Sequence, residues 1–219
     1  SPAIIHAAEP SSPTQTEAAQ QGQDRFPHPF DRQWLVNHAL ELSQQSFELE
    51  ELQTDSPLTK MDYDDYRRIN FDRNAAIWAR EDRNFTIDLF HPGFIFKTPV
   101  HINLVVAGVS RRVLYTSDIF TYDYQVAAVK EAPAPGYSGF RVYHPGLDTE
   151  RLLEFLVFQG ASYFRAAGRD QYYGLSARGI AINTARPVGE EFPYFTEFWV
   201  ERPKVGADQL VVHALLESQ

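Results

Sequence analysis

The chain has 219 residues, of which 43% are hydrophobic and 22% charged, a composition typical of a large globular domain rather than of a disordered protein. Its formal charge of −9 argues against binding to nucleic acid or to an anionic membrane, because both need a cationic face. The absence of cysteine excludes disulfides, thiolate metal sites and cysteine nucleophiles.

Residues 1–27 are rich in Ala, Ser, Gln, Pro and Thr. We expect them to form a flexible arm, because they hold too little apolar surface to offset the entropy of ordering. The chain starts at Ser1 without a charged leader, as it would also after removal of a signal peptide. No run of about 18 apolar residues occurs, so no membrane span is expected.

Two short helices are predicted near the start of the domain. Asp31 is expected to cap the first, whose apolar face carries Trp34, Leu35, His38, Ala39 and Leu42. The second is predicted over residues 63–69, with acidic residues in its first turn and arginines near its end, as the helix dipole favours. The acidic cluster around Asp64 lacks the remaining ligands of a calcium loop, so no metal site is expected there.

Alternating apolar and polar residues predict strands in the rest of the chain. The clearest cover residues 85–89, 101–106, 196–201 and 210–217, separated by proline and glycine breaks. A turn or two of helix is expected over residues 149–155. The sequence therefore predicts a mainly β protein, an antiparallel β-sandwich with a small helical N-terminus.

A His-Pro-Gly tripeptide occurs at residues 91–93 and again at residues 144–146. Proline followed by glycine suits the centre of a type II turn, and this interpretation is favoured for both copies. The alternative is a metal ion shared by the two histidines. No other pattern points to a metal, and no cofactor is expected.

Residues 160–186 combine small residues, tyrosines and four arginines with a single acid, Asp170. Tyrosine offers a stacking face and a hydroxyl, and arginine offers a planar fork of donors. The mixture suits a neutral polyhydroxylated ligand or a carboxylate. The equally weighted alternative is ordinary strand structure in which the arginines pair with glutamates elsewhere.

Carboxylates lie in this segment and just after it. Cleavage of a glycoside needs two of them facing one bond. Glu190, Glu191, Glu197 and Asp170 are the local candidates. For each, a solvated or salt-bridged role is favoured. Glu190 and Glu191 would also point to opposite faces of a strand.

Several separated segments resemble the periplasmic glucan biosynthesis proteins of G and D type. They are Phe90-His91-Pro92-Gly93-Phe94, Gly160-Ala161-Ser162-Tyr163-Phe164-Arg165-Ala166, Tyr173-Gly174-Leu175-Ser176-Ala177-Arg178-Gly179, Gly189-Glu190-Glu191-Phe192-Pro193, Phe198-Trp199 and Glu201-Arg202-Pro203. The resemblance implies an N-terminal sandwich of the galactose-mutarotase type, to which residues 28–219 would contribute the N-terminal part. It also implies an immunoglobulin-like C-terminal domain, which is absent from this chain.

The resemblance further implies a periplasmic location after signal-peptide removal, and a role in osmoregulated glucans with a β-1,2-linked glucose backbone. Some D-type relatives are similar to inverting endo-β-1,2-glucanases that use two aspartates. Those acids are expected outside this chain, so no catalytic residue is named and enzyme activity is left open.

We expect a periplasmic protein that binds and processes a β-1,2-glucan oligosaccharide or polymer. The alternative is a non-catalytic glucan-binding or scaffold module, and a weaker one is a plain β-sandwich interaction domain. The missing C-terminal half of the same protein is the second expected partner. Under the glucan hypothesis, the residues expected to contact the sugar are Tyr163, Phe164, Arg165, Asp170, Tyr172, Tyr173, Arg178 and Glu191.

Overall fold

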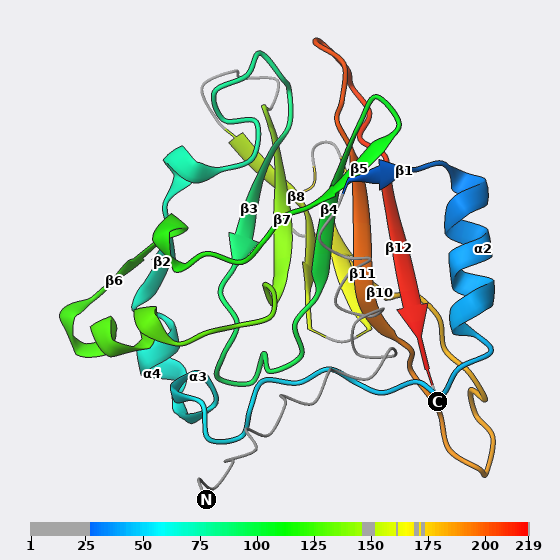
Figure 1. Ribbon diagram of the computed structural model, residues 1–219, viewed down its shortest axis with the longest axis horizontal. Coiled ribbons are helices and arrows are strands. Elements are labelled where there is room, and N and C mark those ends of the chain that lie inside the picture. Colours follow the sequence, from blue (N-terminus) through cyan, green and yellow to red (C-terminus); the bar gives the residue numbers. More distant parts are fainter. Residues whose placement is uncertain (1–26, 146–151, 161, 169–170, 172–173, 219) are drawn as a thin grey trace, which may run out of the picture.

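The fold comes from a computed structural model, which describes residues 27–145, 152–160, 162–168, 171 and 174–218 (Figure 1). Within these ranges the protein is mainly β, as predicted, with two five-stranded sheets packed as a sandwich and a small two-stranded sheet beside them. The predicted N-terminal arm lies almost wholly outside the described residues.

The first sheet has the strand order β1-β5-β4-β11-β12. Its strands are β1 His28–Pro29, β4 His101–Val106, β5 Val109–Arg112, β11 Tyr194–Glu201 and β12 Val212–Glu217. All neighbours are antiparallel except β4 and β11, which run parallel and pair from His101 with Glu197 to Val105 with Glu201. The sandwich is therefore antiparallel apart from one pair in its first sheet.

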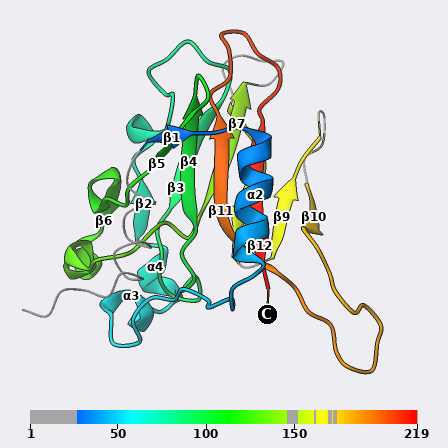
Figure 2. The ribbon, with the colours of Figure 1, turned by 45° about the vertical axis from the view of Figure 1, so that its right-hand side comes forward.

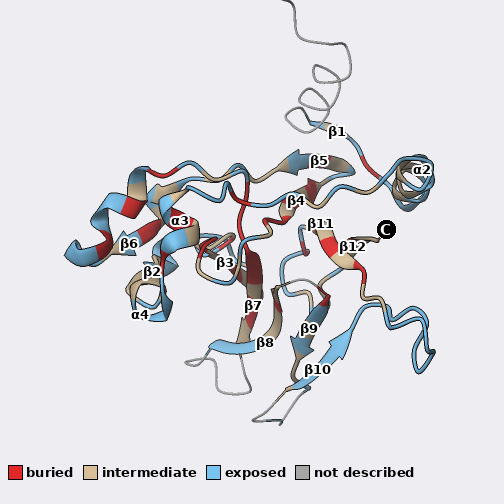
Figure 3. Cartoon of the chain, turned by 90° about the horizontal axis from the view of Figure 1, so that it is seen from below, coloured by how far each residue is buried: buried red, intermediate tan, exposed pale blue. Residues whose placement is uncertain are grey.

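The second sheet has the order β10-β9-β8-β7-β3 and is antiparallel throughout. Its strands are β3 Thr86–Phe90, β7 Gly139–Pro145, β8 Leu152–Gln159, β9 Tyr163–Ala166 and β10 Leu175–Arg178. β2 Ile69–Phe71 and β6 Phe120–Tyr122 form the separate two-stranded sheet. At one edge of the second sheet, β10 is exposed along its whole length, whereas most of β7 is buried (Figure 3).

The helices are short and lie mainly in the first half of the chain. They are α2 Arg32–Leu42, α3 Pro57–Lys60 and α4 Tyr63–Tyr66, with 3-10 turns at η1 Arg73–Ala75, η2 Ser117–Ile119 and η3 Tyr124–Glu131. The predicted cap of α2 is confirmed, since the Asp31 carboxylate accepts a hydrogen bond of 2.7 Å from the Trp34 backbone N–H. The second predicted helix is shorter than expected, because Ile69 already belongs to β2.

The four predicted strands correspond to β3, β4, β11 and β12, with ends that shift by up to two residues. The helix expected over residues 149–155 is wrong where the structure describes it, because residues 152–155 lie in β8. Pairing of β8 with both β7 and β9 supplies long-range hydrogen bonds that outweigh a weak local helical pattern.

The turn expected at the first His-Pro-Gly lies further along the chain. Gly93 and Phe96 exchange backbone hydrogen bonds of 2.9 and 2.8 Å, so Phe94 and Ile95 form the centre of the turn. Phe94 adopts the left-handed region with φ of 57°. At the second copy, Pro145 pairs with Leu152 at the end of β7, and Gly146 lies outside the described residues.

The main core fills the space between the two sheets. Its fully buried members include Phe198 and Val200 from the first sheet and Ile87, Phe140 and Val142 from the second. A smaller core lies on the opposite face of the first sheet, where α2 packs on Trp199 and Leu215 (Figure 2). The first sheet is thus covered on both faces. The face of the second sheet turned away from the core carries Arg141, Val157 and Arg165, beside a fully buried Asp88.

Candidate functional site

The predicted sugar-contacting segment folds into the β9–β10 hairpin at the edge of the second sheet (Figure 2). Tyr163 pairs with Arg178, Phe164 with Ala177, and Arg165 with Ser176. Residues paired across neighbouring strands lie on the same face, and successive residues alternate between faces. The pairing therefore separates Tyr163 and Arg165 from Phe164.

Phe164 points to the core. Its ring lies 5.3 Å from that of Phe158, and it packs against the main core. Tyr163 is 47% exposed and Arg165 is exposed, so both lie on the face turned away from the core. We call this side of the second sheet the outer face; it carries Asp88, Arg141, Val157 and Arg165 in one row of paired residues.

Arg178 is held in place by two contacts. Its guanidinium donates a hydrogen bond of 2.9 Å to the Ser162 hydroxyl and lies 3.6 Å from the centre of the Phe192 ring. Glu191, next to Phe192 in the chain, pairs through its backbone with Ile182, and its carboxylate accepts a hydrogen bond from the Ser218 hydroxyl near the end of β12. The structure therefore brings Tyr163, Arg165 and Arg178 onto one hairpin, whereas Glu191 belongs to the segment that follows it.

Three further predicted contacts, Asp170, Tyr172 and Tyr173, lie outside the described residues.

Two glycines of the hairpin motif have a packing role. A Cβ atom on Gly174 would lie 2.6 Å from the Ala166 carbonyl oxygen, so a side chain there would push β10 away from β9. A Cβ atom on Gly179 would lie 2.6 Å from a methyl group of Leu216. Close approach within the chain thus explains these glycines without a ligand.

Sequence reasoning missed a charged cluster further along the outer face. Arg141 lies 3.2 Å from the carboxylate of Asp88 and 3.4 Å from that of Glu154. The Arg73 guanidinium lies 4.4 Å from the centre of the Tyr143 ring. Burial raises the pKa of Asp88, although the nearby Arg141 and Arg73 lower it in part. Asp88, Arg141 and Glu154 lie in strands, so the only available sequence signal was a charged residue among apolar ones, and Arg73 comes from the η1 turn.

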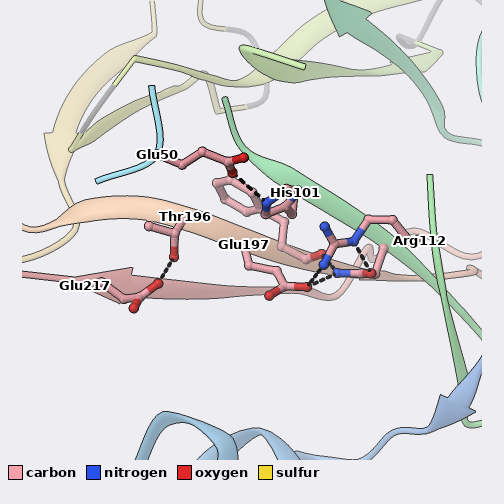
Figure 4. Close-up of polar contacts among 8 residues, drawn as sticks. Glu50, His101, Arg112, Thr196, Glu197 and Glu217 are labelled. Atoms are coloured by element: carbon pink, nitrogen blue, oxygen red, sulfur yellow. Dashed lines mark hydrogen bonds and ion pairs between the residues drawn. The ribbon is translucent and has the colours of Figure 1, made fainter. Parts of the chain in front are cut away.

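Glu197, one of the carboxylates considered for catalysis, belongs to a polar network on the first sheet (Figure 4). Its carboxylate lies 2.7 Å from a guanidinium nitrogen of Arg112 and accepts a hydrogen bond of 2.7 Å from Asn103. The Arg112 and Glu197 side chains are only 8% and 13% exposed. The salt-bridged role favoured for Glu197 is what the structure contains.

His101 and Glu50 lie in the same close-up, 3.0 Å apart, and the hydrogen bond from His101 lowers the pKa of Glu50 (Figure 4). The loop before α3 is thereby tied to the first sheet. This network fixes the fold of the first sheet and lies on a different sheet from the β9–β10 hairpin.

His91 is a buried structural residue. It is 4% exposed, its Nδ1 lies 2.6 Å from the Pro92 carbonyl oxygen, and its Nε2 lies 3.0 and 3.1 Å from the hydroxyls of Tyr122 and Tyr115. Its own carbonyl oxygen accepts a hydrogen bond from the Tyr66 hydroxyl. Burial lowers the pKa of His91 from 6.5 to about 4.

This shift makes stability depend on pH. Because the folded state protonates His91 only near pH 4 while the unfolded chain does so near 6.5, acidification favours unfolding over that interval. We expect His91 alone to remove about 3 kcal/mol of stability between pH 7 and pH 4. Chemical denaturation of the wild type and of His91→Gln at several pH values measures this, and the wild type should lose about 3 kcal/mol more than the variant. Parallel pH curves would refute the assignment.

A polar pocket of about 550 Å³ lies beside the two-stranded sheet. Its lining includes Arg67 and Arg68, which pair with Asp64 at 3.6 Å and with Asp123 at 3.9 Å. Asp62 caps α4, so the acidic cluster of the sequence is engaged locally. Among the residues that the structure describes, no group of three His, Asp or Glu is placed to hold a metal ion.

Comparison with known proteins assigns the family. The model of the family described as periplasmic glucan biosynthesis protein, MdoG, matches residues 30–219. The chain belongs to this periplasmic glucan biosynthesis family. The glucans biosynthesis protein G of Shewanella frigidimarina is 43% identical over 191 residues, which are 86% of this chain and 34% of that protein. The probable glucans biosynthesis protein D of Shewanella oneidensis is 40% identical over 189 residues, which are 86% of this chain and 35% of that protein.

The chain thus spans about a third of the length of these relatives in the glucan biosynthesis family. The family match covers every strand of the two large sheets except β1, including the hairpin and the whole outer face. No helix in the described part of the chain combines the length and apolar character needed to cross a membrane.

Proposed function

We propose that this part of the protein binds a β-1,2-linked glucan in the periplasm, through the outer face of β9 and β10. The observation that carries the proposal is that Tyr163 and Arg165, two residues apart on one strand, are both exposed on that face. Membership of the periplasmic glucan biosynthesis family supports a glucan ligand and a periplasmic location.

The chemistry of these side chains suits a sugar. An exposed tyrosine ring can stack on the apolar C–H face of a glucose unit, and its hydroxyl can exchange hydrogen bonds with the sugar. Arg165 adds several N–H donors beside it, and these can serve hydroxyl oxygens without requiring a charged ligand. Glucan is uncharged, so the net charge of −9 does not oppose its binding.

The residues of this chain are proposed to bind the glucan, and no cleavage step is assigned to them. Any cleavage or trimming of the glucan is assigned to the part of the relatives that this chain does not cover, and that part is the second proposed partner of the sandwich. Of the four carboxylates considered for cleavage, the three in the described residues are engaged within the fold: Glu190 accepts a hydrogen bond from the Ala185 backbone, Glu191 accepts one from Ser218, and Glu197 pairs with Arg112. The glucan-processing and scaffold versions of the function differ only in whether the intact protein changes the length of the glucan.

We expect Tyr163→Ala in the intact protein to weaken binding of linear β-1,2-gluco-oligosaccharides by about 1–3 kcal/mol, by analogy with bases stacked on aromatic rings. Isothermal titration calorimetry measures the loss. Tyr163→Phe keeps the ring and should retain most of the affinity. Tyr124→Ala is the matched control, because Tyr124 is 83% exposed on η3, outside the second sheet.

Equal affinity of wild type and Tyr163→Ala would refute the proposed surface. Titration with β-1,4-linked oligosaccharides of the same length tests the linkage. Incubation with the β-1,2 polymer then separates the two versions of the function, because release of shorter chains indicates a hydrolase and an unchanged length indicates a scaffold.

A further inference from the structure

The outer face continues beyond the hairpin, along one row of paired residues. Strand register aligns Asp88 with Arg141, Arg141 with Val157, and Val157 with Arg165. The side chains in this row therefore point to the same side of the sheet as Tyr163. Neighbouring strands lie about 4.8 Å apart, so the backbones at Arg141 and Arg165 are separated by roughly 10 Å, with the short Val157 between them.

The buried Asp88 carboxylate holds the Arg141 guanidinium in place. Its Nε and Nη2 atoms both lie 3.2 Å from the same Asp88 oxygen, and the Asp88 side chain is completely buried. The other Asp88 oxygen has no hydrogen-bond partner in the described residues. A buried carboxylate costs stability unless it is paired, so the fold keeps this group at a cost that the ion pair with Arg141 offsets only in part.

The outward part of the cluster is accessible. The Nη1 atom of Arg141 lies 3.4 Å from the Glu154 carboxylate, and these side chains are 30% and 32% exposed. Together they offer N–H donors and carboxylate acceptors a few ångströms apart. A sugar hydroxyl both donates and accepts, so neighbouring hydroxyls of a glucose unit match such a pair better than either charge alone. The rings of Phe90 and Tyr143 lie 5.5 and 5.3 Å from the guanidinium and restrict its movement.

We propose that Arg141 and Glu154 form a second saccharide contact on the outer face, which longer glucan chains reach after they occupy the hairpin. Asp88 is a positioning residue, since it holds the Arg141 guanidinium without being exposed itself. The inference rests on the proposed glucan binding at Tyr163 and extends it to chains that span at least from β9 to β7.

The test compares two ligands on the intact protein by calorimetry: the β-1,2-linked disaccharide and a linear β-1,2-glucan long enough to cross the row. Arg141→Met should weaken binding of the long glucan roughly tenfold and leave the disaccharide unchanged. Glu154→Gln and Asp88→Asn should act in the same direction, and a purely structural role would not separate the two lengths. Arg111→Met, which removes an exposed arginine from β5 of the other sheet, is the matched control.

If Arg141→Met fails to fold, Glu154→Gln still tests the second contact, because a glutamine of equal size replaces an accessible side chain. If the cluster variants leave both ligands unchanged, or weaken both equally, the second contact is refuted while binding at the hairpin stands. If the wild type binds neither ligand, the proposed function fails and the second contact fails with it.

Discussion

Replacing Trp199 by alanine should destabilise the protein by about 3–5 kcal/mol, the usual cost of truncating a buried tryptophan. Trp199 is 1% exposed, and its ring lies 5.7 Å from Phe30 and 5.8 Å from Trp34. The cavity would open between β11 and α2, where Trp199 is the largest member of the small core. Denaturant unfolding followed by circular dichroism measures the loss.

Trp199→Phe is the informative control. The indole N–H of Trp199 is buried without a hydrogen-bond partner in the described chain, so the substitution removes no hydrogen bond seen there. Phenylalanine keeps most of the buried surface, and the expected cost is below about 1.5 kcal/mol. A similar loss for both variants would mean that the indole nitrogen, not the packing volume, determines stability at this position.

Glu197→Ala should cost about 3 kcal/mol, because it removes a carboxylate that lies 2.7 Å from the largely buried Arg112 guanidinium. Asn103 would lose an acceptor at the same time. Equilibrium unfolding in denaturant gives the free energy. The free energy lost in Glu197→Ala should change little with salt concentration, because salt poorly screens a pair this well shielded from solvent.

Two further variants identify the source of this cost. Glu197→Gln retains an acceptor oxygen and should cost less than half as much as alanine. The double variant Arg112→Met with Glu197→Leu removes both charges and should recover most of the stability, as buried ion pairs replaced by apolar residues often do. If the double variant is as unstable as Glu197→Ala, the imbalance between the Arg112 and Glu197 charges is not the cause of the loss.

Features encoded locally could be predicted from the sequence. The first helix was predicted well, because its apolar spacing and the Asp31 cap lie within a dozen residues of one another. Strands with alternating residues were also found. The error at residues 152–155 arose because β8 is determined by pairing with β7 and β9 rather than by its own pattern. The parallel pairing of β4 with β11 left no local trace at all.

The candidate site was predictable to a similar degree. Tyr163, Arg165 and Arg178 could be grouped from the sequence because all three lie within residues 160–186, and they fall on one hairpin. Phe164 belongs to the same segment, but strand alternation turns its ring to the core. Placing it on that side requires the exact strand register. Arg141, Asp88 and Glu154 come from three separate strands, and only the order of the sheet places them next to the hairpin.

The parallel pair in the first sheet has a consequence for the order in which the chain can fold. His101 and Glu197 are about a hundred positions apart, so pairing β4 with β11 closes a much longer loop than any hairpin does. Until that loop closes, one edge of the β4–β5 hairpin remains unpaired, while the hairpins of the second sheet can already form over short distances. An unpaired edge invites association with other folding copies. The β4–β5 hairpin is therefore most exposed to aggregation before β11 has joined the sheet.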